Sequence, residues 1–135
     1  MNNIYSSRTI DMIQEMRKQG TQYCIDFIGC NEKLLNSSEY IKNLIDKAVK
    51  YSGMVSITKT KIHKFEPFGV TGYALLACSH IAIHTWPEYG YASIDVFACD
   101  KRQKVLDAVA IITDGLQPNK KKVVIIKRGY YEQER

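Results

Sequence analysis

The residues that could do chemistry gather in one short stretch of the chain, between His63 and Asp100. All three histidines, the only tryptophan and two of the four cysteines lie there. Its centre, from Cys78 to Glu88, reads CSHIAIHTWPE. A small domain seldom concentrates so many reactive groups in a segment the length of one hairpin. We therefore expect the functional site in this stretch and expect the flanking sequence to act as its scaffold.

The two central histidines are compatible with more than one kind of site. His80 and His84 would lie on the same face of a regular strand, and they could bind a metal ion if Glu88 or Cys99 supplied a third ligand. The alternative is that both histidines are hydrogen-bonded residues of a sheet. Ser79 beside His80 suggests a hydrolase, yet the chain has no Gly-x-Ser-x-Gly motif. Residue chemistry alone thus predicts a site and leaves its reaction open.

Length and composition describe an ordinary globular protein. The chain has 135 residues, which fits a single domain able to fold alone or as a dimer. Apolar residues make up 45% and charged residues 24% of the chain, as is usual for soluble proteins. No apolar run approaches the roughly 20 residues that span a bilayer, and residues 1–8 lack the apolar core of a secretory signal. We therefore expect a cytoplasmic protein with no membrane partner.

The net charge of +5 comes with one dense basic cluster, Lys120–Lys122. Lysines directly before the strand-like residues 123–126 are typical of a solvated turn, whereas nucleic-acid surfaces usually add exposed aromatic side chains or a reading helix. We therefore expect no nucleic-acid partner. The four cysteines show no C-x-x-C pairing, which argues against a zinc site. We expect free thiols in a reducing compartment and no bound metal.

Hydrophobic periodicity places the reactive stretch within a series of strands. Residues 70–77 are apolar enough to predict a strand buried on both faces. Residues 87–90 predict the hairpin loop that joins two further strands. In full, strands are expected at residues 23–28, 54–65, 70–77, 79–86, 91–98 and 123–127.

Helices are expected on both sides of these strands. One runs from about residue 38 to 51, capped by Ser37 or Ser38, with apolar residues at helical spacing. A second begins near residue 105 and is closed by Gly115 and Pro118. Residues 8–18 predict a further short helix that looks like an appendage. We therefore divide the chain into an N-terminal helical extension, residues 1–19, and one domain, residues 20–135.

The order of these elements indicates an α+β fold. We expect a two-layer sandwich in which one mostly antiparallel sheet carries the two main helices on one face. The other face of the sheet then needs a cover, and a second copy of the chain is the simplest one. A dimer formed through the sheet face or its edge is therefore expected.

Three segments of the reactive stretch together resemble one known family. They read HKFEPFGVTG at residues 63–72, SHIAIHTWPEYGYA at 79–92 and IDVFAC at 94–99. They strongly resemble the prokaryotic S-adenosylmethionine decarboxylase family, whose members are pyruvoyl-dependent, and the resemblance covers roughly residues 21–130. It implies a small-molecule substrate, S-adenosylmethionine, and a product used in spermidine synthesis.

The resemblance also implies a cofactor that the chain makes from itself. In the family, the serine at the position of Ser79 attacks the carbonyl of the preceding residue, and β-elimination then breaks the chain. The new terminus becomes a pyruvoyl group, so residues 1–78 and 79–135 would form two chains. His84 matches the base that serves this processing. Thr71 stands where the family usually has a serine whose hydroxyl assists it.

Other residues match positions used in turnover. In the family, the pyruvoyl carbonyl condenses with the substrate amine as a Schiff base, and Cys99 matches the proton donor that acts after carbon dioxide leaves. Phe65 and Trp86 could stack on adenine or shape the pocket, and Glu88 could bind ribose hydroxyls. For these three residues, packing of the aromatic rings and a turn role for Glu88 are the alternative interpretations.

The sequence departs from the family pattern near the expected site. Cys78 replaces the usual glutamate before the reactive serine, and Asp100 replaces the usual glycine. Thr21 and Gln22 replace an arginine and a histidine, and Ala98 replaces a threonine. These changes keep two alternatives open: a pyruvoyl-dependent decarboxylase acting on ornithine or arginine, and an uncleaved, non-catalytic homologue that works as a partner. The presence of Ser79, His84 and Cys99 together favours the decarboxylase.

Overall fold

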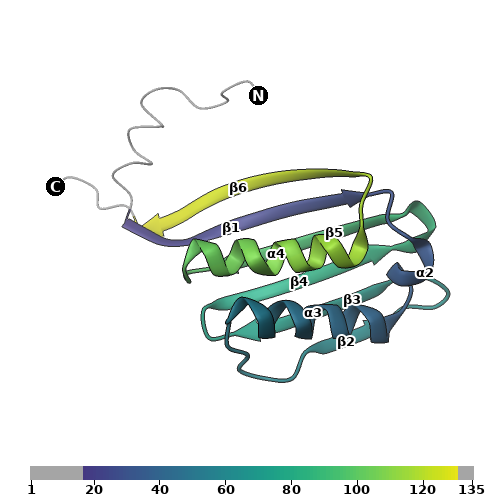
Figure 1. Ribbon diagram of the computed structural model, residues 1–135, viewed down its shortest axis with the longest axis horizontal. Coiled ribbons are helices and arrows are strands. Elements are labelled where there is room, and N and C mark those ends of the chain that lie inside the picture. Colours follow the sequence, from purple (N-terminus) through teal and green to yellow (C-terminus); the bar gives the residue numbers. More distant parts are fainter. Residues whose placement is uncertain (1–16, 131–135) are drawn as a thin grey trace.

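A computed structural model describes residues 17–130, which form a sheet of six strands with helices on one face (Figure 1). The strand order is β2-β3-β4-β5-β1-β6, and all neighbouring strands pair antiparallel. The elements are β1 Arg17–Ile28, α2 Glu32–Leu35, α3 Ser38–Ser52, β2 Lys61–Lys64, β3 Val70–Leu76, β4 Ser79–Trp86, η1 Pro87–Tyr89, β5 Tyr91–Ala98, α4 Arg102–Leu116 and β6 Lys120–Tyr130. The expected α+β sandwich is confirmed.

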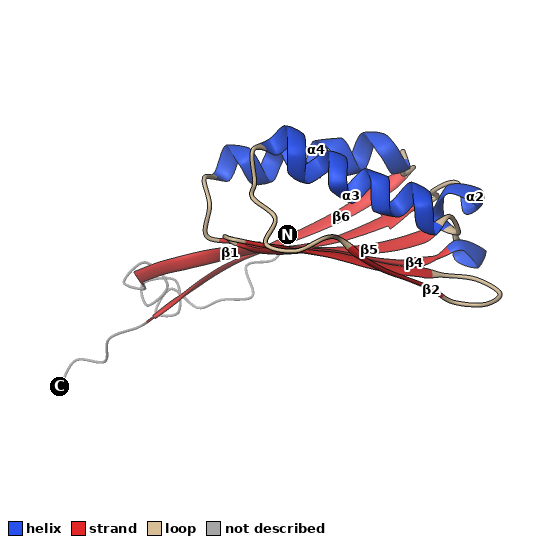
Figure 2. Cartoon of the chain, turned by 90° about the horizontal axis from the view of Figure 1, so that it is seen from below, coloured by secondary structure: helices blue, strands red, loops and turns tan. Residues whose placement is uncertain are grey.

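The core lies between the sheet and the helices, and Figure 2 shows that the helices of residues 17–130 cover one face of the sheet only. Residues in β4 and β5 alternate between buried and half-buried positions, so every second side chain meets the helix layer. From β4 and β5 the buried side chains are Ile81, Ile83, Thr85, Ala92, Ile94, Val96 and Ala98. From α3 and α4 they are Ile41, Leu44, Ile45, Ala48, Val49, Ser52, Val105, Ala108, Ile112 and Leu116.

Both long helices have clear sequence signals. The Ser37 side chain accepts a hydrogen bond from the Tyr40 N–H at 3.1 Å, which caps the start of α3. Gly53 ends α3 in the left-handed region at φ +80°, where a glycine pays no steric cost. The helix α4 extends one residue beyond Gly115, whose carbonyl accepts a hydrogen bond from the Tyr40 hydroxyl at 2.6 Å. That bond ties the two helices together.

Two expected strands differ from the structure. Only Lys61–Lys64 of residues 54–65 form a strand, whereas Ser56 makes one isolated bridge to Leu76. The alternating apolar residues there, Val55 and Ile57, are 62% and 61% exposed, so the alternation has no core behind it. The expectation that residues 70–77 are buried on both faces is wrong, because β3 alternates and none of the described helices covers its other face (Figure 2).

The first and last strands are longer than expected and pair with each other along their whole length. The cluster Lys120–Lys122 begins β6 and is therefore part of a strand, not of a turn. The strand β1 begins at Arg17, three residues before the domain boundary expected at residue 20. The rest of the expected N-terminal helix lies outside the described residues.

The face of the sheet opposite the helices, here called the open face, carries a mixture of aromatic, apolar and polar side chains. The cross-strand pairs His80–Phe97, Ala82–Asp95, His84–Ser93 and Trp86–Tyr91 share this face. Large apolar side chains on it are 40–42% exposed, namely Tyr73, Leu75, Trp86, Val124 and Ile126. Among residues 17–130, no helix is long and apolar enough to cross a membrane.

Candidate active site

The peptide bond between Cys78 and Ser79 lies at one end of the sheet, where a two-residue turn joins β3 to β4. Ser79 pairs with Leu76 on one side and with Ala98 on the other. Its φ angle is +137°, in a region that side-chain-bearing residues rarely adopt. Such strain costs about 1–3 kcal/mol and persists only where the surrounding structure holds it. The residue expected to be reactive is therefore also a strained one.

The carbonyl of Cys78 is held by two donors from one residue. The backbone N–H of Cys99 donates to it at 3.1 Å, and the Cys99 thiol donates at 3.5 Å. Residue 99 faces residue 78 because Ala98 pairs with Ser79 in the β4–β5 ladder. Two donors aimed at one carbonyl oxygen polarise that carbonyl and favour attack at its carbon.

The side chain of Cys78 is half-buried against the hydrophobic core. Burial is the main cause that raises the pKa of the Cys78 thiol, and the negative charge of the nearby Asp100 carboxylate adds to it. Asp100 itself accepts the Lys101 N–H at 2.7 Å, which is the main cause that lowers the pKa of this carboxyl group.

His84 and Thr71 form a second cluster on the open face. The Oγ1 of Thr71 and the Nδ1 of His84 are 3.0 Å apart, because β3 and β4 pair these two residues directly. His84 lies five positions after Ser79 on the same strand, and at about 3.3 Å per residue this places it roughly 16 Å away. The structure thus joins Thr71 to His84 and separates both from Ser79 within one chain.

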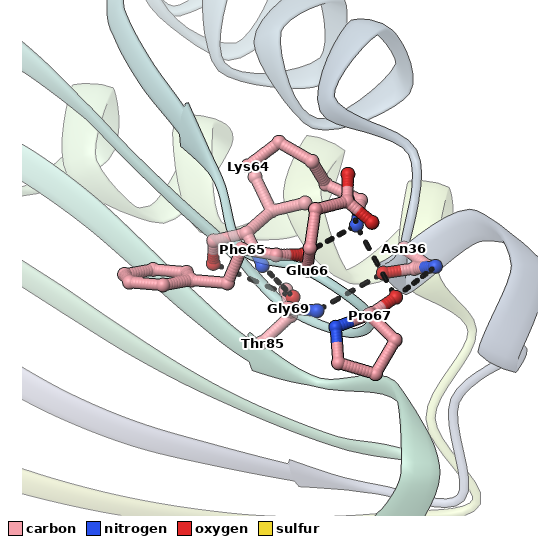
Figure 3. A network of polar contacts seen from close by, with 8 residues as sticks. Asn36, Lys64, Phe65, Glu66, Pro67, Gly69 and Thr85 are labelled. Carbon is pink, nitrogen blue, oxygen red and sulfur yellow. Dashed lines mark hydrogen bonds and ion pairs between the residues drawn. The ribbon is translucent and has the colours of Figure 1, made fainter.

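Phe65 follows β2 in a loop that is fixed by hydrogen bonds to its neighbours (Figure 3). Its N–H donates to the Gly69 carbonyl at 2.8 Å, and the Gly69 N–H donates to Asn36 Oδ1 at 3.0 Å. Asn36 Nδ2 and Lys64 Nζ each lie 3.4 Å from the carbonyl oxygen of Pro67. The ring of Phe65 points away from this network and is 47% exposed, so it is available for contact.

Trp86 and Glu88 lie at the end of β4 far from Ser79. The Trp86 ring stacks on Tyr91, with 5.1 Å between ring centroids, and it is 40% exposed. Glu88 is exposed in the short helix η1. Phe65, Trp86 and Glu88 therefore all present surface, but on one chain they do not meet the Cys78–Ser79 bond.

Several polar residues of this region carry no signal in the sequence. Asp26 accepts the Tyr91 hydroxyl at 2.6 Å, and this hydrogen bond is the main cause that raises the pKa of Tyr91. Arg128 donates to Gln22 at 3.0 Å and lies over the Phe97 ring at 5.6 Å. Each of these contacts joins two segments that are far apart in the chain. Predicting them would require the pairing register of the strands.

Two cavities, of about 350 and 360 Å³, lie away from the open face. The first is lined by Thr21, Tyr23, Ala98, Asp100, Arg102, Val105, Ile125 and Lys127. The second lies between α3 and α4. Neither is lined by Ser79, His84 or Trp86. Within the described part of the chain, no group of three His, Cys, Asp or Glu side chains is placed to hold a metal ion.

Known proteins resemble this chain over most of its length. The model of the S-adenosylmethionine decarboxylase family matches residues 21–129. A protein of Methanococcus maripaludis named S-adenosylmethionine decarboxylase proenzyme is 43% identical over 114 residues, 84% of this chain and 93% of that protein. One of the same name from Clostridium tetani is 39% identical over 119 residues, 87% of this chain and 93% of its own.

A solved structure gives the same result for the fold. The adenosylmethionine decarboxylase of Aquifex aeolicus superposes with a TM-score of 0.80 at 35% sequence identity, covering 88% of this chain and 98% of that one. Its sequence identity is high enough to indicate common ancestry together with a common architecture. The family match, the two relatives and this structure agree. The chain belongs to the S-adenosylmethionine decarboxylase family.

Proposed function

We propose that this protein is the precursor of a pyruvoyl-dependent S-adenosylmethionine decarboxylase and that it cleaves itself between Cys78 and Ser79. Membership of the family supports the activity. The observation that carries the proposal is the geometry of the Cys78–Ser79 bond. Its carbonyl accepts two hydrogen bonds from Cys99, and the residue after it is held at φ +137°. Strain on one side and polarisation on the other both favour breaking this bond.

In the proposed cleavage, the Ser79 hydroxyl oxygen bonds to the Cys78 carbonyl carbon. The peptide C–N bond breaks, the nitrogen takes the proton, and the two residues become joined by an ester. The Cys99 N–H stabilises the negative charge that develops on the carbonyl oxygen during the attack. A base then removes the α-proton of Ser79, and the ester oxygen leaves as the new carboxylate of Cys78. Addition of water and loss of ammonia convert the remaining dehydroalanine into the pyruvoyl group.

His84 is the proposed base, and its position requires a second copy of the chain. Since roughly 16 Å of strand separates it from its own Ser79, the Thr71–His84 pair can reach only the Ser79 of another protomer. We therefore propose a homodimer that packs open face to open face and shares two sites. This arrangement is supported by the exposed apolar side chains on that face, Tyr73, Leu75 and Trp86. In a two-fold interface both copies of each side chain would be buried.

In turnover, the pyruvoyl group supplies a carbonyl that takes up electrons as carbon dioxide leaves. The Cys99 thiol, exposed at the end of β5, is the proposed donor of the proton that replaces the carboxylate. Phe65 and Trp86 would stack on the adenine of S-adenosylmethionine, and Glu88 would accept hydrogen bonds from its ribose hydroxyls. All four cysteines are free thiols, which supports a reaction in the cytoplasm.

The test begins with the intact mass of the purified protein under denaturing conditions, with Ser79→Ala as the control. We expect two chains divided between residues 78 and 79, the second with a pyruvoyl terminus, and one unbroken chain for the control. Release of carbon dioxide from carboxyl-labelled S-adenosylmethionine, ornithine and arginine then identifies the substrate. An unbroken chain after long incubation would overturn the proposal, and release only from ornithine or arginine would overturn the proposed substrate.

A further inference from the structure

We propose that the cavity between the start of α4 and the strands β1 and β6, here called the α4 cavity, binds the phosphate group of a small molecule. Its volume is about 350 Å³, which lies in the range of small-molecule sites. Thr21 and Tyr23 of β1 line it together with Val105 of α4, so it lies on the helix side of the sheet. The inference does not depend on the proposed function, because Ser79 and His84 do not line this cavity.

Two hydroxyl groups in the α4 cavity have no partner in the described part of the chain. Thr21 is 9% and Tyr23 is 5% exposed. No hydrogen bond within residues 17–130 involves either hydroxyl, and none of the polar side-chain atoms there is both fully enclosed and unpaired. Both hydroxyls therefore reach the open space that their residues line. A nearly buried hydroxyl without a partner costs free energy, and a ligand that accepts its hydrogen removes that cost.

Two positively charged side chains line the same cavity. Arg102 is the first residue of α4, and Lys127 lies on β6 directly opposite Thr21. The ion pairs within residues 17–130 involve other lysines, so neither of these two charges is neutralised there. The α4 N-terminus has no side-chain cap, and its dipole adds positive potential. Hydroxyl donors, two cations and a helix N-terminus together favour an anion, and phosphate accepts hydrogen bonds from all three kinds of group.

Asp100 is the one acidic side chain that lines the α4 cavity. Its carboxylate is already engaged, because it accepts the Lys101 N–H at 2.7 Å and lies 3.5 Å from Lys104 Nζ. The Lys104 charge offsets the repulsion that this carboxylate would exert on an anion. Its remaining acceptor capacity suits a hydroxyl group of the ligand.

The rest of the α4 cavity is apolar and larger than a phosphate group needs. Ala98, Val105 and Ile125 line this part, and Ile125 is 52% exposed. An organic group attached to the phosphate would cover these side chains, and its hydroxyl groups could reach Asp100. We therefore expect a small phosphate ester to bind more tightly than inorganic phosphate.

A groove that holds only water makes a different prediction. Phosphate would then respond to the overall charge of the protein and not to the position of one lysine. Lys127 and Arg128 separate these cases, since they are neighbours in β6 but Arg128 lies over the ring of Phe97, on the open face. Replacing either residue with glutamine removes the same charge from opposite faces of the sheet.

The experiment titrates the purified full-length protein with inorganic phosphate, ribose 5-phosphate and ribose, in phosphate-free buffer and by calorimetry. We expect saturable binding of both phosphates, tighter for ribose 5-phosphate, and none of ribose. Tyr23→Phe and Lys127→Gln should each weaken phosphate binding about tenfold, as for the loss of a hydrogen bond to a charged group. Arg128→Gln should bind as the unsubstituted chain does. The Ser79→Ala chain should also bind normally, which separates this inference from self-cleavage.

Absence of saturable phosphate binding, or equal binding by Lys127→Gln and Arg128→Gln, would overturn the proposal. Normal binding by Tyr23→Phe would do the same. This variant keeps the aromatic ring, and without phosphate its thermal stability should be unchanged or higher, because it loses only an unpaired hydroxyl. If the two phosphates bind, their relative affinity identifies the source of the group: equal affinity supports inorganic phosphate as the ligand, and tighter binding of ribose 5-phosphate supports an ester.

Discussion

The two ends of β4 hold candidate site residues in different surroundings. At the first end, a strained Ser79 follows a carbonyl that Cys99 already polarises. At the second end, the His84 ring is paired with the Thr71 hydroxyl, but the Cys78–Ser79 bond of the same chain is too far away for it to reach. The comparison shows that one chain places Cys99 against the carbonyl of the Cys78–Ser79 bond, the proposed cleavage site, but holds His84, the proposed base, too far along the same strand to reach it.

The largest expected effect concerns His84, at the end of β4 far from Ser79. His84→Ala should slow cleavage by about 10²- to 10⁴-fold, the usual contribution of a positioned base. Co-expression with Ser79→Ala should restore cleavage of the His84→Ala chain, because the partner then supplies the histidine. Intact masses of the two differently tagged chains measure this. If the mixed protein stays uncleaved while each variant still dimerises, the base acts within one chain or is another residue.

A smaller effect is expected at the end of β4 that carries Ser79. It separates the two proposed roles of Cys99, polarising the Cys78 carbonyl during cleavage and donating a proton in turnover. Cys99→Ala keeps the backbone N–H on the Cys78 carbonyl, so cleavage should slow by less than about tenfold, the value of one weak hydrogen bond. Decarboxylation by the cleaved protein should fall by about 10²-fold because the proton donor is gone. Cys99→Ser provides the matched control. Near-normal release of carbon dioxide from Cys99→Ala would assign the donor role elsewhere.

The smallest expected effect concerns the orientation of His84. Thr71→Val removes the hydroxyl that lies 3.0 Å from Nδ1 while keeping the size of the side chain. We expect cleavage to slow about 5- to 10-fold, as for the loss of one neutral hydrogen bond, and Thr71→Ser to retain most of the rate. A pulse-chase measurement suffices. Equal rates for Thr71→Val and the unsubstituted chain would mean that the ring is oriented by other contacts.

The sequence correctly predicts the strands and helices in which the regularly spaced apolar residues are buried in the structure. Residues 79–86 and 91–98 became β4 and β5 with the expected bounds, and Ser37 caps α3 as expected. Residues 55–59 also alternate, but they are exposed, so alternation without a core predicted a strand that does not form. Both terminal strands extend beyond their apolar centres because pairing between β1 and β6 continues through lysine-rich sequence.

The sequence names candidate site residues one by one, but it does not predict how they are arranged. Ser79 and His84 are five positions apart, so strand spacing alone indicates a separation of roughly 16 Å along β4. The contact between Cys99 and the Cys78 carbonyl depends on the β4–β5 register, which a hairpin loop of unknown geometry leaves open. Asp100 comes near Cys78 because it follows β5, whose end pairs with Ser79, and no local pattern encodes that approach.

The hydrogen bond from the Cys99 thiol to the Cys78 carbonyl also sets an order of events in time. While the Cys78–Ser79 bond is intact, the Cys99 thiol, the proposed proton donor in turnover, is hydrogen-bonded to the carbonyl of that bond. In the proposed cleavage, this carbonyl becomes part of the new chain end at Cys78, which no peptide bond then holds beside residue 79, and the pyruvoyl group forms in the same sequence of steps. The proposed proton donor is therefore freed from the intact peptide bond by the same reaction that makes the cofactor.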